Sequence, residues 1–231
     1  MSGPTHDPKR KLLESHCLLR MLTGGEIDSL LAHARVARYP AGREIFAKGS
    51  PGDSMMAIIS GRVRISSLSP DGKEIVLNII DSGEIFGEIA MLDGKERTAD
   101  ATAMTDTELL VLSRRDFLPL LERHADMCLM LLGVACERLR QTSEQVEDVF
   151  FQHLEQRLAK ALLRLARTGD QPVKDSPRIE IKLSQRELGN LVGATRESIN
   201  RHLQVWQRSG IVDLEKGSIV VKDAKALAAL A

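Results

Sequence analysis

The segment Ile45–Leu112 alternates between apolar and polar residues, which is the pattern of β-strands that bury one face. Turn-forming residues such as Pro, Asp and Gly interrupt the alternation, so the predicted strands are short. Arg62–Leu68 and Glu74–Ile80 flank a Pro-Asp-Gly turn and are predicted to form a hairpin. Several hairpins in succession indicate a β-sandwich or roll. Helical patterns lie on either side of it, at Glu26–Ala37 and Arg114–His124.

A long helical pattern follows, from about Asp126 to Phe151. Its alternating spacing of three and four residues is that of a heptad seam. The seam positions are Leu129, Leu132, Cys136, Leu139, Ser143, Val146 and Phe150. This pattern is compatible with a helix in the core of its own domain and with a helix that pairs with a second copy of the chain. The polar Ser143 favours the dimer, because a core within one chain would prefer an apolar residue there.

The remainder of the chain alternates helices with short strands. A helix is predicted over Leu154–Thr168 and a strand over Arg178–Lys182. Two β-prone segments, Ile211–Leu214 and Ser218–Val221, flank a turn at residues 215–217 and are predicted to form a hairpin. A short helix is expected at the C-terminus.

Two further helices have the signature of a helix-turn-helix. Ser184 and Glu187 form a capping box at the start of the first helix, because each side chain accepts a hydrogen bond from the other residue's backbone amide. Gly193 permits a sharp turn, and Thr195 can cap the second helix, which extends to about Gln207. Two short helices joined by a glycine-bearing turn are typical of DNA-binding domains.

The second of these helices separates polar from apolar side chains. With about 100° of rotation per residue, its apolar side holds Ile199, Leu203 and Trp206. The opposite stripe holds Arg196, Glu197, Asn200, Arg201 and Gln204. Such side chains suit the major groove, since arginine pairs with guanine, carboxylates accept from cytosine and amides pair with adenine. The alternative is an ordinary solvent-facing stripe. The capped partner helix, the glycine turn and the hairpin, with Lys216 at its tip as a wing, favour DNA.

A second constellation lies in the β-rich part of the chain, where residues 86–92 and 97–99 flank a short loop. Glu88 and Arg97 stand nine positions apart, among small residues that leave backbone amides accessible. A cyclic phosphodiester with a ribose hydroxyl needs this combination. Arginine meets the charge, the Thr98 hydroxyl and amides meet the other phosphate oxygens, and glutamate accepts from the hydroxyl. The spacing alone is equally compatible with a structural Glu–Arg pair across a turn.

Composition narrows the cellular setting. The chain has no run of about 18 apolar residues and begins with a polar stretch, so neither a membrane span nor a secretory signal is expected. The three cysteines, Cys17, Cys128 and Cys136, are too few for a disulfide framework, which favours the cytoplasm. Cys128 and Cys136 are expected to be structural thiols, and a redox switch is the alternative.

The net charge of zero hides a basic C-terminal third. Residues 156–231 carry 14 Lys and Arg against 8 Asp and Glu, an excess of six positive charges. This excess indicates a site for a polyanion such as DNA, although an ordinary solvated surface gives the same count. Neither a nucleophile–base arrangement nor a histidine spacing suited to a metal is evident, so an enzyme is not expected.

Together these motifs resemble the cyclic-AMP receptor protein family, also called the Crp–Fnr family. The resemblance spans nearly the whole chain. It rests on Phe-Gly-Glu-Ile-Ala and Arg-Thr-Ala within residues 86–99, Thr-Ser-Glu at 142–144 and Gly-Ala-Thr-Arg-Glu-Ser at 193–198. It implies an α+β fold with a jelly-roll-like, cyclic-nucleotide-binding β-roll at 1–125, a dimerisation helix at 126–152 and a winged helix-turn-helix DNA-binding domain at 153–231.

The resemblance implies cyclic AMP as the effector ligand. The ligand-binding residues that it implies are Gly87, Glu88, Ile89, Ala90, Arg97, Thr98, Thr142 and Ser143. In the family's cyclic-AMP receptors a Thr-Ser pair contacts the adenine, and its serine reaches across from the partner subunit. Haem and iron–sulfur members use cysteine or histidine ligands that this chain lacks, and no metal is expected. Thr98 replaces the more usual serine and leaves cyclic GMP open, and Ile89 replaces a common leucine.

The resemblance also implies a homodimer that binds double-stranded DNA. The expected DNA-binding residues are Thr195, Arg196, Glu197, Ser198, Asn200, Arg201 and Lys216. Since Arg196, Glu197 and Arg201 match base-contacting positions of the family, an inverted repeat with half-sites similar to TGTGA is expected; Asn200 replaces a small residue there. The loop at 168–177 matches the region where family activators touch RNA polymerase. The alternatives are a cyclic-GMP-responsive or ligand-independent regulator, and a ligand-binding module that acts on a protein partner.

Overall fold

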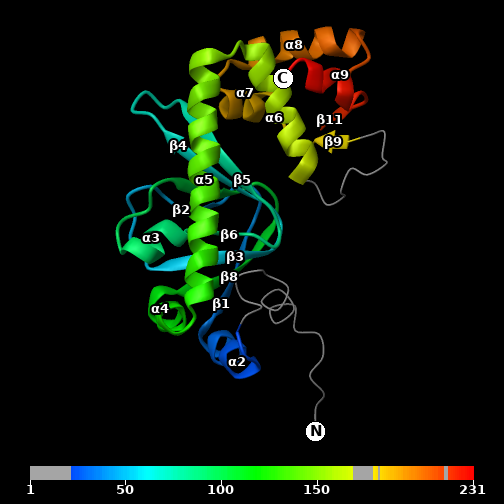
Figure 1. Cartoon of the computed structure of the whole chain (residues 1–231). Helices are drawn as coiled ribbons and strands as arrows, with labels where there is room; N and C mark the ends of the chain where they lie inside the picture. Colours follow the sequence, from blue (N-terminus) through cyan, green and yellow to red (C-terminus); the bar gives the residue numbers. More distant parts are fainter. Residues whose placement is uncertain (1–21, 169–178, 182, 216–217) are drawn as a thin grey trace. The chain divides into compact units, whose positions relative to one another are not determined.

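The N-terminal half of the chain folds into two four-stranded sheets in the computed structural model, which describes residues 22–168, 179–181, 183–215 and 218–231 (Figure 1). The strand orders are β1-β8-β3-β6 and β2-β7-β4-β5. The strands are β1 Arg35–Tyr39, β2 Glu44–Phe46, β3 Ser54–Ser60, β4 Val63–Leu68, β5 Glu74–Ile80, β6 Ile85–Phe86, β7 Asp100–Ala103 and β8 Thr107–Ser113. The predicted β-roll is confirmed, and the two segments of the predicted hairpin form β4 and β5.

Two apolar clusters fill this roll. One joins helical residues such as Phe117 and Leu131 to one side of β3 and β8, and the other lies between the two sheets around Phe86. Neighbouring residues of β3 point in opposite directions, so that Ala57 belongs to the first cluster and Ile58 to the second. Because both faces of β3 are covered, its sequence is continuously apolar where a half-exposed strand would alternate.

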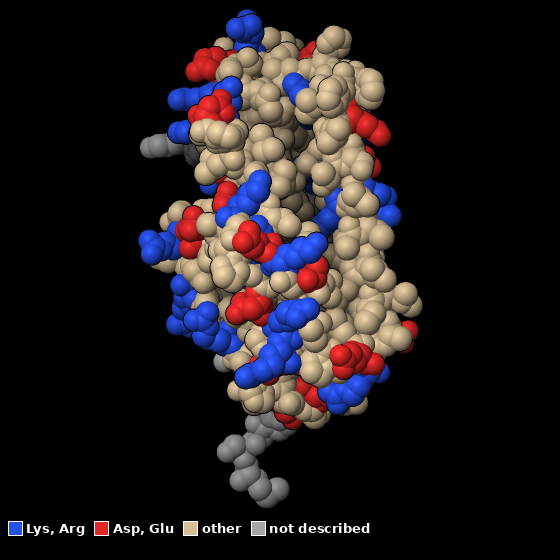
Figure 2. Space-filling model, turned by 90° about the vertical axis from the view of Figure 1, so that its left-hand side faces the viewer, with Lys and Arg blue, Asp and Glu red and all other residues tan. Residues whose placement is uncertain are grey.

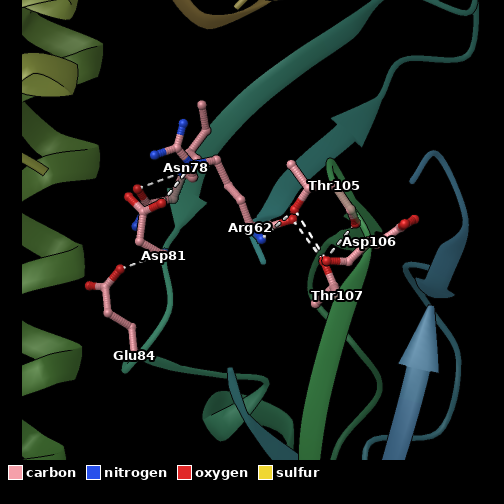
Figure 3. A network of polar contacts seen from close by, with 8 residues as sticks. Arg62, Asn78, Asp81, Glu84, Thr105, Asp106 and Thr107 are labelled. Carbon is pink, nitrogen blue, oxygen red and sulfur yellow. Dashed lines mark hydrogen bonds and ion pairs between the residues drawn. The ribbon is translucent and has the colours of Figure 1, made fainter. Parts of the chain in front are cut away.

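The turn between β3 and β4 is fixed by a polar network (Figure 3). Gly61 adopts a φ of 95°, and a Cβ there would lie 2.5 Å from Thr107 Oγ1. The next residue, Arg62, donates from its backbone amide to Thr105 Oγ1 at 3.1 Å and pairs through Nε with Asp81 at 2.5 Å. The Arg62 side chain therefore ties the start of β4 to the end of β5.

The helices described in this half are α2 Gly24–His33, α3 Glu88–Asp93, α4 Arg114–Arg123 and α5 Ala125–Phe151. The predicted helix at 26–37 is wrong at both ends. It begins at Gly24 because Thr23 and Glu26 form a capping box, and it ends at His33 because Ala34 is extended. Residues 35–37 instead open β1, which pairs antiparallel with β8. None of the described helices is long and apolar enough to cross a bilayer.

Acidic and basic side chains are interspersed on one face of the roll. On the face that Figure 2 shows, Lys and Arg alternate with Asp and Glu at the height of the two sheets and do not gather into one large patch of a single sign. Ion pairs in this unit include that of the exposed Arg38 with the partly exposed Glu108. Exposed pairs of this kind contribute about 1 kcal/mol at most, so the apolar clusters supply most of the stability.

The chain separates into two compact units. The first comprises the described residues up to Ser67 together with Leu77–Arg140, and the second comprises Leu68–Val76 and Gln141–Ala231. The second unit contains α6 Leu154–Thr168, α7 Gln185–Val192, α8 Arg196–Arg208, α9 Ala224–Ala229 and a sheet of order β10-β11-β9, with β9 Ile179–Ile181, β10 Val212–Glu215 and β11 Ser218–Val221. These elements match the predicted ones within a residue or two.

The core of the second unit is built by its helices together with its small sheet, in which β11 is buried along its whole length. Its buried helical residues include Leu158, Leu162, Leu188, Ile199, Leu203 and Trp206. Trp206 also donates from Nε1 to Glu155 Oε1 at 3.2 Å, which satisfies its buried polar group. Ile199, Leu203 and Trp206 are the residues that the helical periodicity assigned to the apolar side of α8.

Candidate functional site

Arg97 is the centre of the first candidate site. It is almost completely buried, with 5% of the residue exposed. Its Nη1 donates to the carbonyl oxygen of Gly87 at 2.9 Å, and its Nη2 donates to Ser54 Oγ at 3.1 Å. Its Cζ lies 4.3 Å from the centre of the Phe46 ring, within the range of a cation–π contact. The buried Nε has no hydrogen-bond partner among the described residues.

The charge of Arg97 is incompletely balanced. Burial lowers the pKa of the guanidinium, while the negative charges of Asp53 and Glu88 raise it. An arginine nevertheless stays cationic in proteins. No described carboxylate lies within ion-pair distance of Arg97. Since a buried cation is costly unless an anion joins it, this side chain is suited to receive an anionic ligand.

Gly87 allows the chain to approach this guanidinium. Its φ of 79° is left-handed, and a Cβ at this position would lie 2.6 Å from Arg97 Nη1. Gly87 is also the N-cap of α3 and provides no side-chain cap, so the first amides of the helix have no side-chain acceptor. At the other end of α3, Arg114 Nε donates to the carbonyl oxygen of Met91 at 2.6 Å. The glycine turn and this arginine cap together hold α3 in place.

Glu88, the first residue of α3, is completely buried. Its Oε1 forms an ion pair with Nη1 of Arg138, a residue of α5, and Arg138 Nη2 donates to the carbonyl oxygen of Ile85. Its Oε2 is buried without a hydrogen-bond partner among the described residues. A buried carboxylate oxygen with no donor is unfavourable, so Oε2 is suited to accept from a hydroxyl of a ligand.

The arrangement differs from a simple Glu–Arg pair across a turn. Glu88 pairs with Arg138, and Arg97 is held by Gly87 and Ser54. Arg138 was not selected by the sequence analysis, although a signal for it exists. It precedes Thr142 by four residues and so lies on the same face of α5.

We expect Arg138→Leu to destabilise the first unit, because the substitution leaves Glu88 buried without its counter-charge. Breaking a buried pair costs roughly 3–5 kcal/mol, and the partial exposure of Arg138 reduces the expected loss to about 2 kcal/mol of unfolding free energy. Adding Glu88→Gln should restore part of that loss. Urea unfolding followed by circular dichroism measures the effect.

Arg140→Leu provides the control for this prediction. Arg140 pairs with Glu137 at 2.8 Å, and both side chains are more than half exposed. Its loss should therefore cost less than about 1 kcal/mol. Equal losses of stability in the Arg138 and Arg140 variants would show that the Glu88–Arg138 pair stabilises the fold no more than the exposed Arg140–Glu137 pair does.

The other residues of the predicted ligand site differ in exposure. Ala90 is buried beside Gly52, where a Cβ would lie 2.1 Å from Ala90 Cβ. Ile89 and Thr98 are exposed at the surface of the first unit. Thr142 is also exposed, as is the neighbouring residue Ser143, and both lie on α5 about one turn beyond Arg138. The structure thus brings Gly87, Glu88 and Arg97 together, and the roles of the remaining residues stay predictions.

The predicted seam of α5 takes no part in the core that the described residues form. Its large apolar residues are all at least half exposed: Leu129, Leu132, Leu139, Val146 and Phe150. The residues of α5 that are buried in the first unit are Met127 and Leu131, on another side of the helix. Cys136, a further seam position, is exposed, and Cys128 is partly buried. The large apolar residues of the seam are therefore exposed along one side of α5.

The second candidate site is the helix-turn-helix formed by α7 and α8. The predicted capping box is present, with Glu187 Oε2 accepting from the Ser184 amide at 2.7 Å. Gly193 is left-handed with a φ of 69°, and Thr195 caps α8 by accepting from the Ser198 amide. A Cβ at Gly189 would lie 2.6 Å from the carbonyl oxygen of Ala194, so α7 and the turn approach closely.

Some polar side chains of α8 are exposed, and others are hydrogen-bonded within the protein. Arg196, Glu197 and Arg201 are exposed. The hydroxyl groups of Thr195 and Ser198 hydrogen-bond each other at 3.1 Å within the cap. Asn200 is half-buried and is bound by a side chain of α7, as described below. Lys216 and the loop at 169–177 lie outside the described residues.

Glu197 is held in its ionised form. Its own backbone amide and Thr195 donate hydrogen bonds that lower the pKa of Glu197, as expected in the first turn of a helix. A carboxylate in this state is an acceptor only. It is therefore suited to the exocyclic amino group of cytosine or adenine and would repel a phosphate.

Two family models match the chain. The cyclic nucleotide-binding domain matches residues 36–124, and the Crp-like helix-turn-helix domain matches residues 156–230. The first match contains the Arg97 site, and the second contains α7 and α8. Among the described residues, no group of at least three His, Cys, Asp or Glu side chains is placed to hold a metal ion.

Individual relatives resemble the chain over most of its length. It is 33% identical over 202 residues to the CRP-like cAMP-activated global transcriptional regulator of Mycobacterium tuberculosis, covering 87% of this chain and 90% of the relative. It is 34% identical over 214 residues to the cyclic AMP receptor protein of Thermus thermophilus, covering 93% and 96%. Among solved structures, the c-di-GMP-responsive global regulator CLP of Xanthomonas campestris is similar with a TM-score of 0.74, 27% identity, and coverage of 87% and 100%.

Proposed function

Because this chain belongs to the Crp–Fnr family of cyclic-nucleotide-binding transcription regulators, we propose that it is a homodimer that binds cyclic AMP and, in response, an inverted-repeat operator. In this proposal residues 1–125 bind the nucleotide, residues 126–152 form the dimerisation helix and residues 153–231 bind DNA. The proposal places the protein in the cytoplasm, gives it no enzymatic activity, and includes RNA polymerase as a partner at activated promoters.

One observation carries the nucleotide part of this proposal. Arg97 and Glu88 are both buried, and each retains a polar atom without a hydrogen-bond partner among the described residues. A cyclic nucleotide supplies what both lack, because its phosphate is an anion and its ribose hydroxyl is a donor. Gly87, Ile89 and Ala90 would contribute backbone amides to the phosphate, and Thr98 its hydroxyl.

Adenine is the base that we favour. Thr142 and Ser143 match the Thr-Ser pair of the family's cyclic-AMP receptors, and several relatives are named for their response to cAMP. The Thr98 hydroxyl also suits the amino group of guanine, and one solved relative is named for c-di-GMP. Calorimetric titration with cyclic AMP, cyclic GMP and cyclic di-GMP tests this choice. Tightest binding of cyclic AMP supports the proposal, and binding of none of the three would overturn it.

The exposed seam of α5 supports the dimer. A two-fold axis along the seam would bring Ser143 close to its counterpart and allow it to reach the nucleotide of the partner subunit. The same axis would present two recognition helices to one face of DNA. Successive major grooves on one face are about 34 Å apart, so the operator should be an inverted repeat with half-sites one helical turn apart.

The ligand can act through α5. Arg138 of α5 contacts both Glu88 and the carbonyl oxygen of Ile85, so nucleotide binding at Glu88 directly affects a residue of the dimerisation helix. A ligand shifts a conformational equilibrium only by its difference in affinity between the two states. We propose that the nucleotide binds more tightly to the arrangement of the two α5 helices that also positions α8 for DNA.

Arg196→Ala should make the free energy of operator binding less favourable by roughly 1–3 kcal/mol, because a contact with one guanine is lost. It should also relax the base selectivity at that position. Arg196 is exposed in the first turn of α8, where its guanidinium can pair with O6 and N7 of guanine. Anisotropy titrations with operators changed one base pair at a time measure both effects. Arg208→Ala, at the other end of α8, is the control. An equal loss for every operator would make Arg196 a phosphate contact.

A further inference from the structure

The first helix of the helix-turn-helix contacts the second through an amide pair. Gln185, the first residue of α7, donates from Nε2 to Oδ1 of Asn200 on α8 at 3.1 Å. Both side chains are half-buried. Asn200 lies on the polar stripe of α8, four residues after Arg196 and directly before Arg201. A residue outside the recognition helix therefore fixes the orientation of a side chain within it.

The hydrogen bond determines what Asn200 can present. The carbonyl oxygen of an amide accepts two hydrogen bonds, and its NH2 group donates two. Gln185 uses one acceptor position of Asn200 Oδ1, and the amide nitrogen of Asn200 takes no part in this bond. One acceptor position and both N–H donors therefore remain on Asn200, and one of these donors lies beside the acceptor.

This acceptor–donor pair matches adenine. In the major groove adenine offers the N6 amino group as a donor and N7 as an acceptor, whereas guanine offers two acceptors. An asparagine oriented in this way would bind adenine through two hydrogen bonds and would place its oxygen against O6 of guanine. Asn200 lies about 6 Å along the helix axis from Arg196, more than the rise of about 3.4 Å per base pair, so it would meet a different base pair.

Packing alone does not require the amide pair. The helices α7 and α8 already contribute the buried apolar side chains of Leu188, Val192, Ile199 and Leu203. These apolar contacts and the Gly193 turn fix the angle between the helices. The amide pair adds a hydrogen bond beside this apolar interface, on the side of α8 that holds the polar stripe.

We propose that Gln185 is a positioning residue for DNA recognition, which holds Asn200 so that Asn200 selects an A·T base pair in each half-site of the operator. This inference rests on the proposed function, since it needs α8 to lie in the major groove. It adds a specificity-determining position outside the recognition helix.

The test uses the full-length protein with cyclic AMP and a library of operators in which every half-site position carries each of the four base pairs. The wild type should prefer A·T at one position through Asn200. Asn200→Ala should reduce that preference by about 5- to 150-fold, because a bidentate contact with a base is worth about 1–3 kcal/mol. Gln185→Ala should reduce it several-fold at the same position, and the double variant should lose no more than Asn200→Ala alone.

Gln185→Glu separates positioning from packing. Glutamate fills the same space, but its carboxylate cannot donate to Asn200 Oδ1 and would turn the amide around. The preference for A·T should therefore fall as it does in Gln185→Ala, whereas a packing role would be preserved. Gln207→Ala is the matched control, because Gln207 is an exposed amide of α8 that binds Asp213 at 3.2 Å. It should leave every base preference unchanged.

The outcomes distinguish this inference from the proposed function. If the operators bind specifically but the Gln185 variants change affinity equally at all positions, or not at all, Gln185 is not a positioning residue. A preference for G·C at the position sensitive to Asn200 would overturn the assignment of adenine. If the protein binds no operator specifically, the proposed function fails as well.

Discussion

Arg97→Ala is expected to abolish the response of DNA binding to cyclic nucleotide. The substitution removes the buried cation that we assign to the phosphate, together with its bonds to Gly87 and Ser54. A hydrogen bond to a charged group contributes about 1.5–3 kcal/mol, and an arginine–phosphate pair commonly has two, so the loss of this pair should weaken nucleotide binding by at least about 100-fold. Calorimetry with cyclic AMP measures the affinity, and operator anisotropy with and without cyclic AMP measures the response.

Two controls accompany this substitution. Arg43→Ala removes an exposed arginine of the same unit and should leave nucleotide affinity unchanged. Circular dichroism of the Arg97 variant should retain the β-sheet signal, since the substitution replaces one residue beside an otherwise apolar cluster. A folded Arg97→Ala protein that still responds to cyclic AMP would show that the phosphate binds elsewhere.

Leu139→Asp is expected to disrupt the proposed dimer. Leu139 lies in the middle of the α5 seam and is 67% exposed in the single chain, so the substitution should hardly affect the fold of the monomer. In a two-fold seam it would bury two like charges close together. Since an unpaired buried charge costs several kcal/mol, we expect the dissociation constant of the dimer to increase by at least about 100-fold. The affinity for the inverted repeat should fall with it.

Analytical ultracentrifugation at several protein concentrations measures this effect. Leu68→Asp, which changes an apolar residue that is 59% exposed but lies outside the seam, is the control and should sediment like the wild type. If the Leu139 and wild-type proteins sediment alike over the whole concentration range, the seam is not the dimer interface.

The sequence predicted the elements that follow a clear period and missed those that do not. Strand alternation located β4 and β5, and capping residues located α7 and α8, because local sequence decides both. The short helix α3 has only six residues, too few for a hydrophobic period to show. The end of α2 was predicted too late because residues 35–37 are apolar enough for either structure, and pairing with β8 makes them a strand.

The candidate site was predictable only where its residues are close in the sequence. Gly87, Glu88 and Arg97 belong to one motif, and the structure brings them together. Ser54 and Phe46 reach Arg97 from distant strands, and nothing in their local sequence marks them. Tertiary contacts of this kind depend on how the sheets pair, which a single sequence does not specify.

The helix-turn-helix shows the same limit. The polar stripe of α8 followed from helical periodicity, but the bond from Gln185 to Asn200 depends on how α7 crosses α8. Similarly, Arg138 shares a face of α5 with Thr142, yet only its contact with Glu88 shows what the arginine does. For both Asn200 and Arg138, the role of the residue depends on its partner on another helix.

In the proposed function, nucleotide binding in the first unit is energetically coupled to DNA binding in the second. The most direct measurement is the affinity of the purified full-length protein for a labelled inverted-repeat operator, determined by anisotropy without nucleotide and with saturating cyclic AMP. Allosteric coupling is typically about 1–3 kcal/mol, so cyclic AMP should tighten operator binding by about 5- to 150-fold. The same operator affinity with and without nucleotide, in a protein that calorimetry shows to bind cyclic AMP, would show that the two sites are not coupled.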